Sequence, residues 1–154
     1  MIACAAVDGD QVGRLLLDAL LVALAANLAN LFDRAPGRVL KVGGLCAIVL
    51  GAAATMDRDL AGVAVAIGAS LALLPADLGE QLMLGDTGAN PLGAALALGL
   101  VLVAPFGVRV AALLVVVAMN LASEVVSFSA VIDAVPPLRW IDRAGRRPRY
   151  PEVP

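Results

Sequence analysis

Five runs of apolar residues, each close to the length needed to cross a lipid bilayer, constrain the fold of this chain most. They cover residues 15–32, 39–56, 60–74, 91–107 and 110–128, with short polar connections between them. Crossing the hydrocarbon core of a bilayer takes about 20 helical residues. The sequence therefore predicts an all-α fold, a polytopic transmembrane helix bundle of about five spans within residues 1–128.

The composition of the chain also favours a membrane protein. Hydrophobic residues make up 61% of the 154 positions and charged residues 16%, whereas soluble domains hold roughly 45–50% and about 25%. The chain has no basic tract of the kind that binds nucleic acid, so no nucleic-acid partner is expected. It contains no histidine, which removes the usual general base and zinc ligand.

Basic residues divide unequally between alternate connections, and this predicts the orientation of the bundle. One side holds Arg34, Arg38, Lys41 and the arginines of residues 129–154, and the other side holds Arg14, Arg58 and Arg109. The positive-inside rule places the first group in the cytoplasm. Residues 129–154 are then a basic, Pro-rich cytoplasmic tail, in which Leu138, Trp140 and Ile141 fit a short interfacial segment.

A polar hinge over residues 83–93 separates two apolar runs and carries the strongest chemical signal. Asp86 lies between Gly85 and Gly88, so a backbone can approach whatever the carboxylate holds. Asn90 followed by Pro91 predicts the N-cap and first residue of a new helix, whose N-terminus suits a phosphate. The hinge therefore predicts a cation site beside a phosphate site, and the alternative is an ordinary turn with a capping aspartate.

Other carboxylates and amides gather near this hinge. Asp77 and Glu80 precede Asp86 with no basic residue between them, which indicates either a shared divalent metal or simple solvation. Asn27, Asn30 and Asp33 recur every three residues, on neighbouring parts of one helical face. Polar side chains this deep in an apolar helix face an aqueous cleft or form hydrogen bonds between helices. The same alternatives apply to the polar stripe of Asn120, Ser123, Glu124 and Ser127.

Two segments resemble motifs of the polyprenyl-phosphate sugar-1-phosphate transferases. Residues 27–33, NLANLFD, are similar to the N-x-x-N-x-x-D opening of a cytoplasmic-loop motif in that family, and residues 82–90, LMLGDTGAN, resemble its F-M-G-D-x-G-S motif. The family includes phospho-MurNAc-pentapeptide translocase and the GlcNAc-1-phosphate transferases. The resemblance implies an Mg²⁺-dependent enzyme of the bacterial plasma membrane. Such an enzyme moves a sugar-1-phosphate from a UDP-sugar to a polyprenyl phosphate lipid, releases UMP and serves cell-wall or peptidoglycan synthesis.

The resemblance also implies roles for individual residues. Asp33 and Asp86 would be catalytic, with Asp86 as the Mg²⁺ ligand, and the substrate-binding positions would be Asn27, Asn30, Gly85 and Gly88. The chain is similar to the back half of the family's members, so a missing N-terminal half or a homo-oligomer is the expected complement.

The chain departs from the family pattern in ways that favour an alternative. Pro36 stands where the family has a second aspartate, and the family's histidine motif has no counterpart. These departures favour a degenerate, non-catalytic relative that binds a lipid phosphate or a partner membrane protein. A third possibility is a small transporter or channel subunit that uses Glu124 and the asparagines as a polar path.

Overall fold

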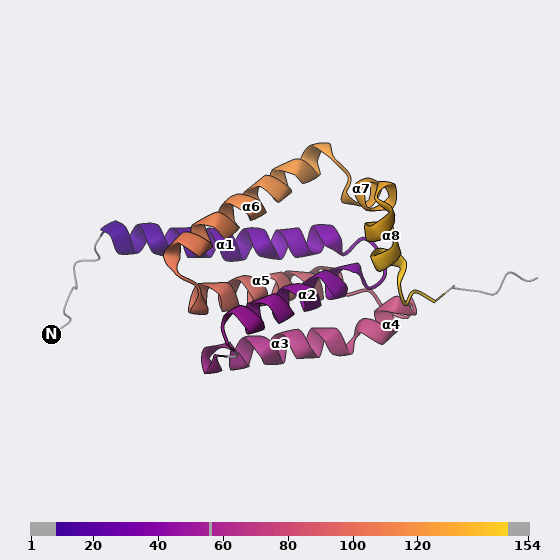
Figure 1. Ribbon diagram of the computed structural model, residues 1–154, viewed down its shortest axis with the longest axis horizontal. Helices are drawn as coiled ribbons and strands as arrows, with labels where there is room; N and C mark the ends of the chain where they lie inside the picture. The colour runs from indigo at the N-terminus through magenta and orange to yellow at the C-terminus, as the bar shows by residue number, and fades with distance from the viewer. Residues whose placement is uncertain (1–8, 56, 148–154) are drawn as a thin grey trace, which may run out of the picture.

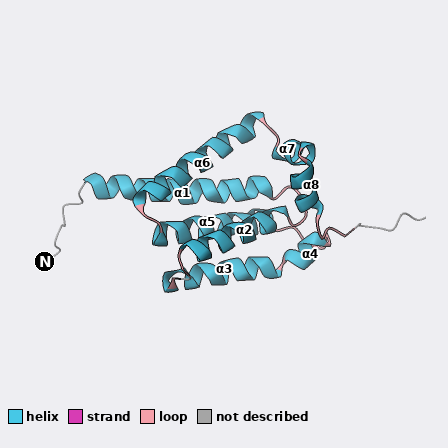
Figure 2. Cartoon of the chain, viewed as in Figure 1, coloured by secondary structure: helices cyan, strands magenta, loops and turns pink. Residues whose placement is uncertain are grey.

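The structure, a computed structural model, describes residues 9–55 and 57–147. Within these ranges it consists of helices joined by short loops, with no β-strand (Figure 2). The elements are α1 (Gly9–Phe32), α2 (Arg38–Ala53), the 3₁₀ helix η1 (Arg58–Leu60), α3 (Ala61–Ala72), α4 (Leu74–Leu78), α5 (Gly85–Val103), α6 (Phe106–Val125), α7 (Phe128–Ala134) and α8 (Pro136–Arg143). The prediction of an all-α bundle is confirmed.

The long helices run lengthwise through the bundle, and α7 and α8 lie at one end (Figure 1). α5 contacts α1, α2 and α3, while α6 packs against α1 and diverges from it toward the α7 end. The predicted division of the chain near residue 128 falls at the start of α7. The loop from α1 to α2, the loop from α4 to α5 and the α7–α8 segment all meet at this end of the bundle.

Four helical segments of the described chain are long and apolar enough to cross a membrane. They are Gln11–Phe32, Arg58–Leu78, Gly85–Val103 and Phe106–Val125. The run at 39–56 forms α2, whose 16 residues extend ~24 Å, less than the ~30 Å of hydrocarbon. Large apolar side chains such as Leu16, Ile48 and Leu114 are exposed on the outside of the bundle. This surface is compatible with a membrane-embedded protein.

Small residues let α1 and α5 approach closely, as is common for helices in lipid. A Cβ atom built on Gly93 of α5 would lie 2.3 Å from the carbonyl oxygen of Ala25 and 2.7 Å from the Cβ of Ala29 in α1. Beside this contact, Leu40 of α2 and Leu92 of α5 are almost completely buried. The centre of the bundle is therefore where α5 packs between α1 and α2.

The predicted helix start at Asn90–Pro91 is wrong, because α5 begins at Gly85. Gly85 has a φ of +60°, a left-handed conformation that glycine adopts readily, and the chain turns there directly into the helix. Pro91 consequently lies inside α5, where its missing N–H removes one helical hydrogen bond.

The structure also defines the remaining connections of the bundle. Pro105 is the N-cap of α6, and Arg109, which the sequence places in a connection, lies within that helix. Arg109 forms an ion pair at 2.6 Å with Asp18 of α1, so the charged pair joins two helices. α3 ends at Ala72 and α4 begins at Leu74, so the helix is interrupted just before Pro75.

Candidate functional site

Asp33 lies at the junction of the two motifs that the sequence singled out. It follows the last residue of α1, and its backbone N–H donates to the carbonyl oxygens of Ala29 and Asn30. Its side chain is 7% exposed, and its Oδ2 accepts a hydrogen bond of 2.7 Å from the backbone N–H of Gly85. This bond joins the end of α1 directly to the start of α5, across 52 residues of sequence.

A cavity of about 510 Å³ opens beside Asp33 at this end of the bundle. It is lined by Asp33, Arg34, Ala35, Pro36, Asp77, Glu80, Leu82 and Met83. Asp77, from α4, is only 2% exposed and accepts a hydrogen bond of 3.0 Å from the backbone N–H of Gly37. Two buried carboxylates, one just after α1 and one in α4, therefore share the wall of one cavity, and each accepts a hydrogen bond from the backbone N–H of another segment.

The electrostatic environment of Asp33 disfavours its negative charge. Burial raises the pKa of Asp33 above its ordinary value, and the hydrogen bond from Gly85 opposes that rise. The nearby charges of Asp77 and Asp86 raise the pKa further. A carboxylate held among other carboxylates becomes more acidic when a cation binds beside it, so this end of the bundle is suited to a positively charged ligand.

Asp86 lies in the first turn of α5 and is exposed. Its charge acts on Asp33, although Asp86 is not among the described residues that line the cavity. Within the described ranges, no group of three or more His, Cys, Asp and Glu side chains is arranged to hold a metal ion. Mg²⁺ in nucleotide sites commonly takes one or two carboxylates together with phosphate oxygens. Asp33 and Asp86 fit that smaller donor set.

The two glycines of the hinge have different roles. The backbone of Gly85 is held by Asp33, and its position has open space around it. A Cβ atom on Gly88 would lie 2.6 Å from the Cγ of Leu84, so Gly88 makes room for packing within the hinge. Of the two predicted substrate-binding glycines, Gly85 is the one in contact with the cavity wall.

One of the two asparagines of α1 forms a hydrogen bond to a neighbouring helix. The Nδ2 of Asn27 donates a hydrogen bond of 2.7 Å to the Oδ1 of Asn120 in α6, and the Nδ2 of Asn120 donates to the carbonyl oxygen of Leu24. The interhelical hydrogen bond weighed for these residues is therefore present at Asn27. Asn30 is half-buried one turn before Asp33, and the structure leaves its predicted substrate contact as a prediction.

The polar stripe on α6 lines a second, smaller cavity. This space of about 230 Å³ is bordered by Arg34 from the α1–α2 loop and by Ser123, Glu124 and Ser127 at the end of α6. Glu124 is exposed there rather than enclosed in the bundle. The stripe therefore continues the polar end of the bundle instead of forming a path through its length.

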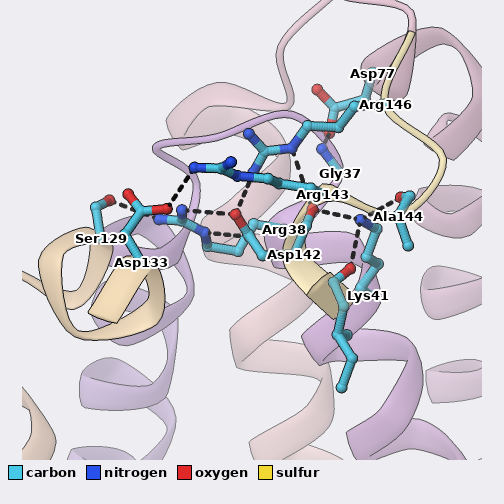
Figure 3. A network of polar contacts seen from close by, with 11 residues as sticks. Gly37, Arg38, Lys41, Asp77, Ser129, Asp133, Asp142, Arg143, Ala144 and Arg146 are labelled. Carbon is cyan, nitrogen blue, oxygen red and sulfur yellow. Dashed lines mark hydrogen bonds and ion pairs between the residues drawn. The ribbon is translucent and has the colours of Figure 1, made fainter. Parts of the chain in front are cut away.

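A buried charge cluster that the sequence did not predict joins α2 to the α7–α8 segment (Figure 3). Arg38 in α2 is 5% exposed. Its Nε lies 2.7 Å from Oδ1 of Asp142 and its Nη2 lies 3.1 Å from Oδ2 of the same residue, in α8. Its Nη1 donates to the hydroxyl oxygen of Ser129 at 2.7 Å, and Arg146 also pairs with Asp142. Arg38 therefore attaches α7 and α8 to the start of α2.

Lys41 completes this attachment at the carboxyl end of α8. Its Nζ donates to the carbonyl oxygens of Ile141, Asp142 and Ala144 at 3.1, 2.7 and 2.7 Å (Figure 3). Burial alone would raise the pKa of Asp142, but the hydrogen bond and charge of Arg38 and the charges of Arg146 and Lys41 together outweigh burial. The pKa of Asp142 is consequently lowered, and the carboxylate stays charged.

Comparison of the chain with protein-family models, with curated proteins and with solved structures finds no match. The function is therefore inferred from the site itself and from the two motifs that meet in it.

Proposed function

We propose that this protein is a membrane phosphoglycosyl transferase that moves a sugar-1-phosphate from a UDP-sugar to a polyprenyl phosphate. The observation that carries the proposal is the hydrogen bond from Gly85 to Asp33. It joins the two segments that resemble motifs of this transferase family, although they lie more than 50 residues apart. A chance resemblance of two short segments gives no reason for them to meet beside a cavity.

The chemistry of the site supports phosphoryl transfer. Phosphoryl transfer needs positioning and charge neutralisation more than covalent participation by the protein. Asp86 and Asp33 would hold Mg²⁺, which neutralises the diphosphate of the UDP-sugar when it is bound. The buried Asp33 is positioned by Gly85, so its carboxylate is oriented before any ligand arrives.

The distribution of basic residues supports a cytoplasmic site in the bacterial plasma membrane. Arg34, Arg38 and Lys41 lie at the cavity end of the bundle, as do the arginines of α8. The smaller basic group lies in η1, which directly precedes α3, and in the first turns of α1 and α6, and these segments are at the other end of the bundle (Figure 1). The positive-inside rule then turns the cavity toward the cytoplasm, where UDP-sugars are made.

The proposal is tested by exchange of labelled UMP into UDP-sugars in membranes that contain the full chain and Mg²⁺. We expect exchange in the unaltered protein and its loss in Asp86→Ala and Asp33→Asn. Asp59→Asn is the matched control, because Asp59 is exposed in η1 at the opposite end of the bundle. Persistence of exchange in Asp86→Ala would show that the metal assignment is wrong, and absence of exchange with UDP-GlcNAc and UDP-MurNAc-pentapeptide would reject the enzyme.

A non-catalytic relative that binds a lipid phosphate is the second candidate. The chain has no histidine, and the charges of Arg38 and Lys41 are used by α8 rather than left at the cavity. Both observations favour binding without turnover. This candidate predicts Mg²⁺-dependent binding of polyprenyl phosphate that Asp86→Ala weakens, together with no exchange of UMP in the same membranes.

A further inference from the structure

α8 has one face toward α2 and another toward the outside. Asp142 is buried against Arg38, and Leu138 and Ile141 border the same space as Asp142 beside α2. On the opposite side of α8, Trp140 is 75% exposed. A large aromatic ring that is turned away from the bundle suits an interfacial surrounding on the outer side of α8.

The attachment to α2 places α8 at the level where the lipid-facing surface of the bundle ends. Lys41, which holds the carboxyl end of α8, lies in the first turn of α2. The exposed apolar face of α2 begins beyond it and continues through Leu45, Ile48 and Val49. α8 itself lies across the end of the bundle rather than along it (Figure 1). This is the position and direction of a helix in the membrane–water interface.

The outer side of α8 also carries positive charge around a hollow. Arg139 and Arg143, one helical turn apart, border a space of about 390 Å³ together with Trp140, Pro136 and Ala144. The ion pair of Arg143 with Asp133, at 3.0 Å, is exposed on both sides, and pairs of this kind contribute little energy. Arg143 can therefore exchange that partner for a lipid phosphate at small cost.

We propose that the outer face of α8 is a docking surface for anionic phospholipid. Trp140 lies at the level of the headgroups, where tryptophan is enriched in membrane proteins, and Arg139 and Arg143 contact lipid phosphates. The buried pair of Arg38 with Asp142 holds the helix at that depth. The surface is separate from the Asp33 cavity, so it does not depend on the transferase proposal.

Trp140 makes the proposal directly testable, because it is the only tryptophan of the chain. The full chain is reconstituted in vesicles of phosphatidylcholine alone or mixed with phosphatidylglycerol. Quenching of the tryptophan emission is measured with nitroxides attached near the headgroup, with nitroxides deep in the acyl chain, and with aqueous iodide. We expect stronger quenching by the shallow nitroxide than by the deep one, protection from iodide, and more shallow quenching in the anionic vesicles.

Variants separate charge recognition from simple burial. Arg139→Gln combined with Arg143→Gln should abolish the extra shallow quenching in anionic vesicles and leave the signal in phosphatidylcholine unchanged. Arg58→Gln, at the opposite end of the bundle, is the matched control and should change neither value. Full access of iodide with no lipid quenching would overturn the proposal in favour of a surface for a protein partner. Equal quenching in both kinds of vesicle would refute the recognition of anionic lipid.

Discussion

Removing the carboxylate of Asp142 should destabilise the protein more than removing any exposed carboxylate of the same segment. Asp142→Ala deletes both hydrogen bonds that the carboxylate accepts from Arg38 and leaves the guanidinium buried with only the Ser129 hydroxyl. Breaking a buried ion pair by removing one partner costs about 3–5 kcal/mol. Because the Ser129 bond remains, we expect the lower end of that range, about 3 kcal/mol of unfolding free energy.

The measurement is denaturant unfolding of the detergent-solubilised chain, followed by the emission of Trp140 in α8. Asp133→Ala is the control, because its pair with Arg143 is exposed and should contribute at most about 1 kcal/mol. The double variant Arg38→Met with Asp142→Leu should recover most of the loss, since an apolar pair of similar volume needs no desolvation of charge. Equal destabilisation by Asp142→Ala and Asp133→Ala would refute the reasoning that burial makes the Arg38 pair important.

Two further predictions concern the core and the cavity. Gly93→Ala should cost about 1–3 kcal/mol through overpacking against Ala25, measured by the same unfolding assay, whereas Gly68→Ala, with open space at that position, should not destabilise. The raised pKa of Asp33 means that its charged form is disfavoured in the folded protein, so its contribution to stability falls as pH rises above the ordinary value of 3.8. Asp33→Asn should therefore raise the unfolding midpoint at pH 7 and give no gain below pH 3.8, and a gain that is independent of pH would contradict this.

The long apolar runs predicted the bundle well because their structure depends on local composition. α1 ends at Phe32 as predicted, although it begins at Gly9 instead of residue 15, and both ends of α6 fall within a few residues of the predicted ends. Each helix satisfies its own backbone, so its length and apolarity decide where it forms. The start of α5 was missed, because Asn90–Pro91 is a strong local signal and the contact that replaces it comes from Asp33. The residues around Gly85 give no information about a hydrogen-bond acceptor such as Asp33, which lies more than 50 residues away in the sequence.

The charge pairs were missed for the same physical reason. Arg38 and Asp142 are separated by 104 residues, and Arg109 and Asp18 by 91 residues. The positive-inside rule accounts for where such arginines occur along the chain but gives no partner for any of them. The sequence therefore predicted the end of the bundle at which the polar residues gather, and the structure was needed to separate those that hold α8 from those at the cavity.

Asp77 offers a way to distinguish a carboxylate that shapes the cavity from one that acts in it. Its Oδ2 accepts the N–H of Gly37, whose φ of +70° sets the turn between α1 and α2. Asp77→Asn keeps an oxygen acceptor for that N–H and removes the charge, whereas Asp77→Ala removes both. If Asp77 is architectural, Asp77→Asn should unfold like the unaltered protein, and Asp77→Ala should lose about 1–3 kcal/mol for the unpaired N–H.

The same two variants also test whether the charge of Asp77 helps to bind Mg²⁺, when the Mg²⁺ dependence of UMP exchange is measured. If Asp77 only supports the fold, the Mg²⁺ concentration for half-maximal UMP exchange should be the same in Asp77→Asn as in the unaltered protein. An increase in that concentration, with stability preserved, would show that the charge of Asp77 contributes to holding the cation. Because Asp77 and Asp33 share one cavity wall, the comparison of Asp77→Asn with Asp33→Asn also ranks the two buried carboxylates by their contribution to metal binding rather than to folding.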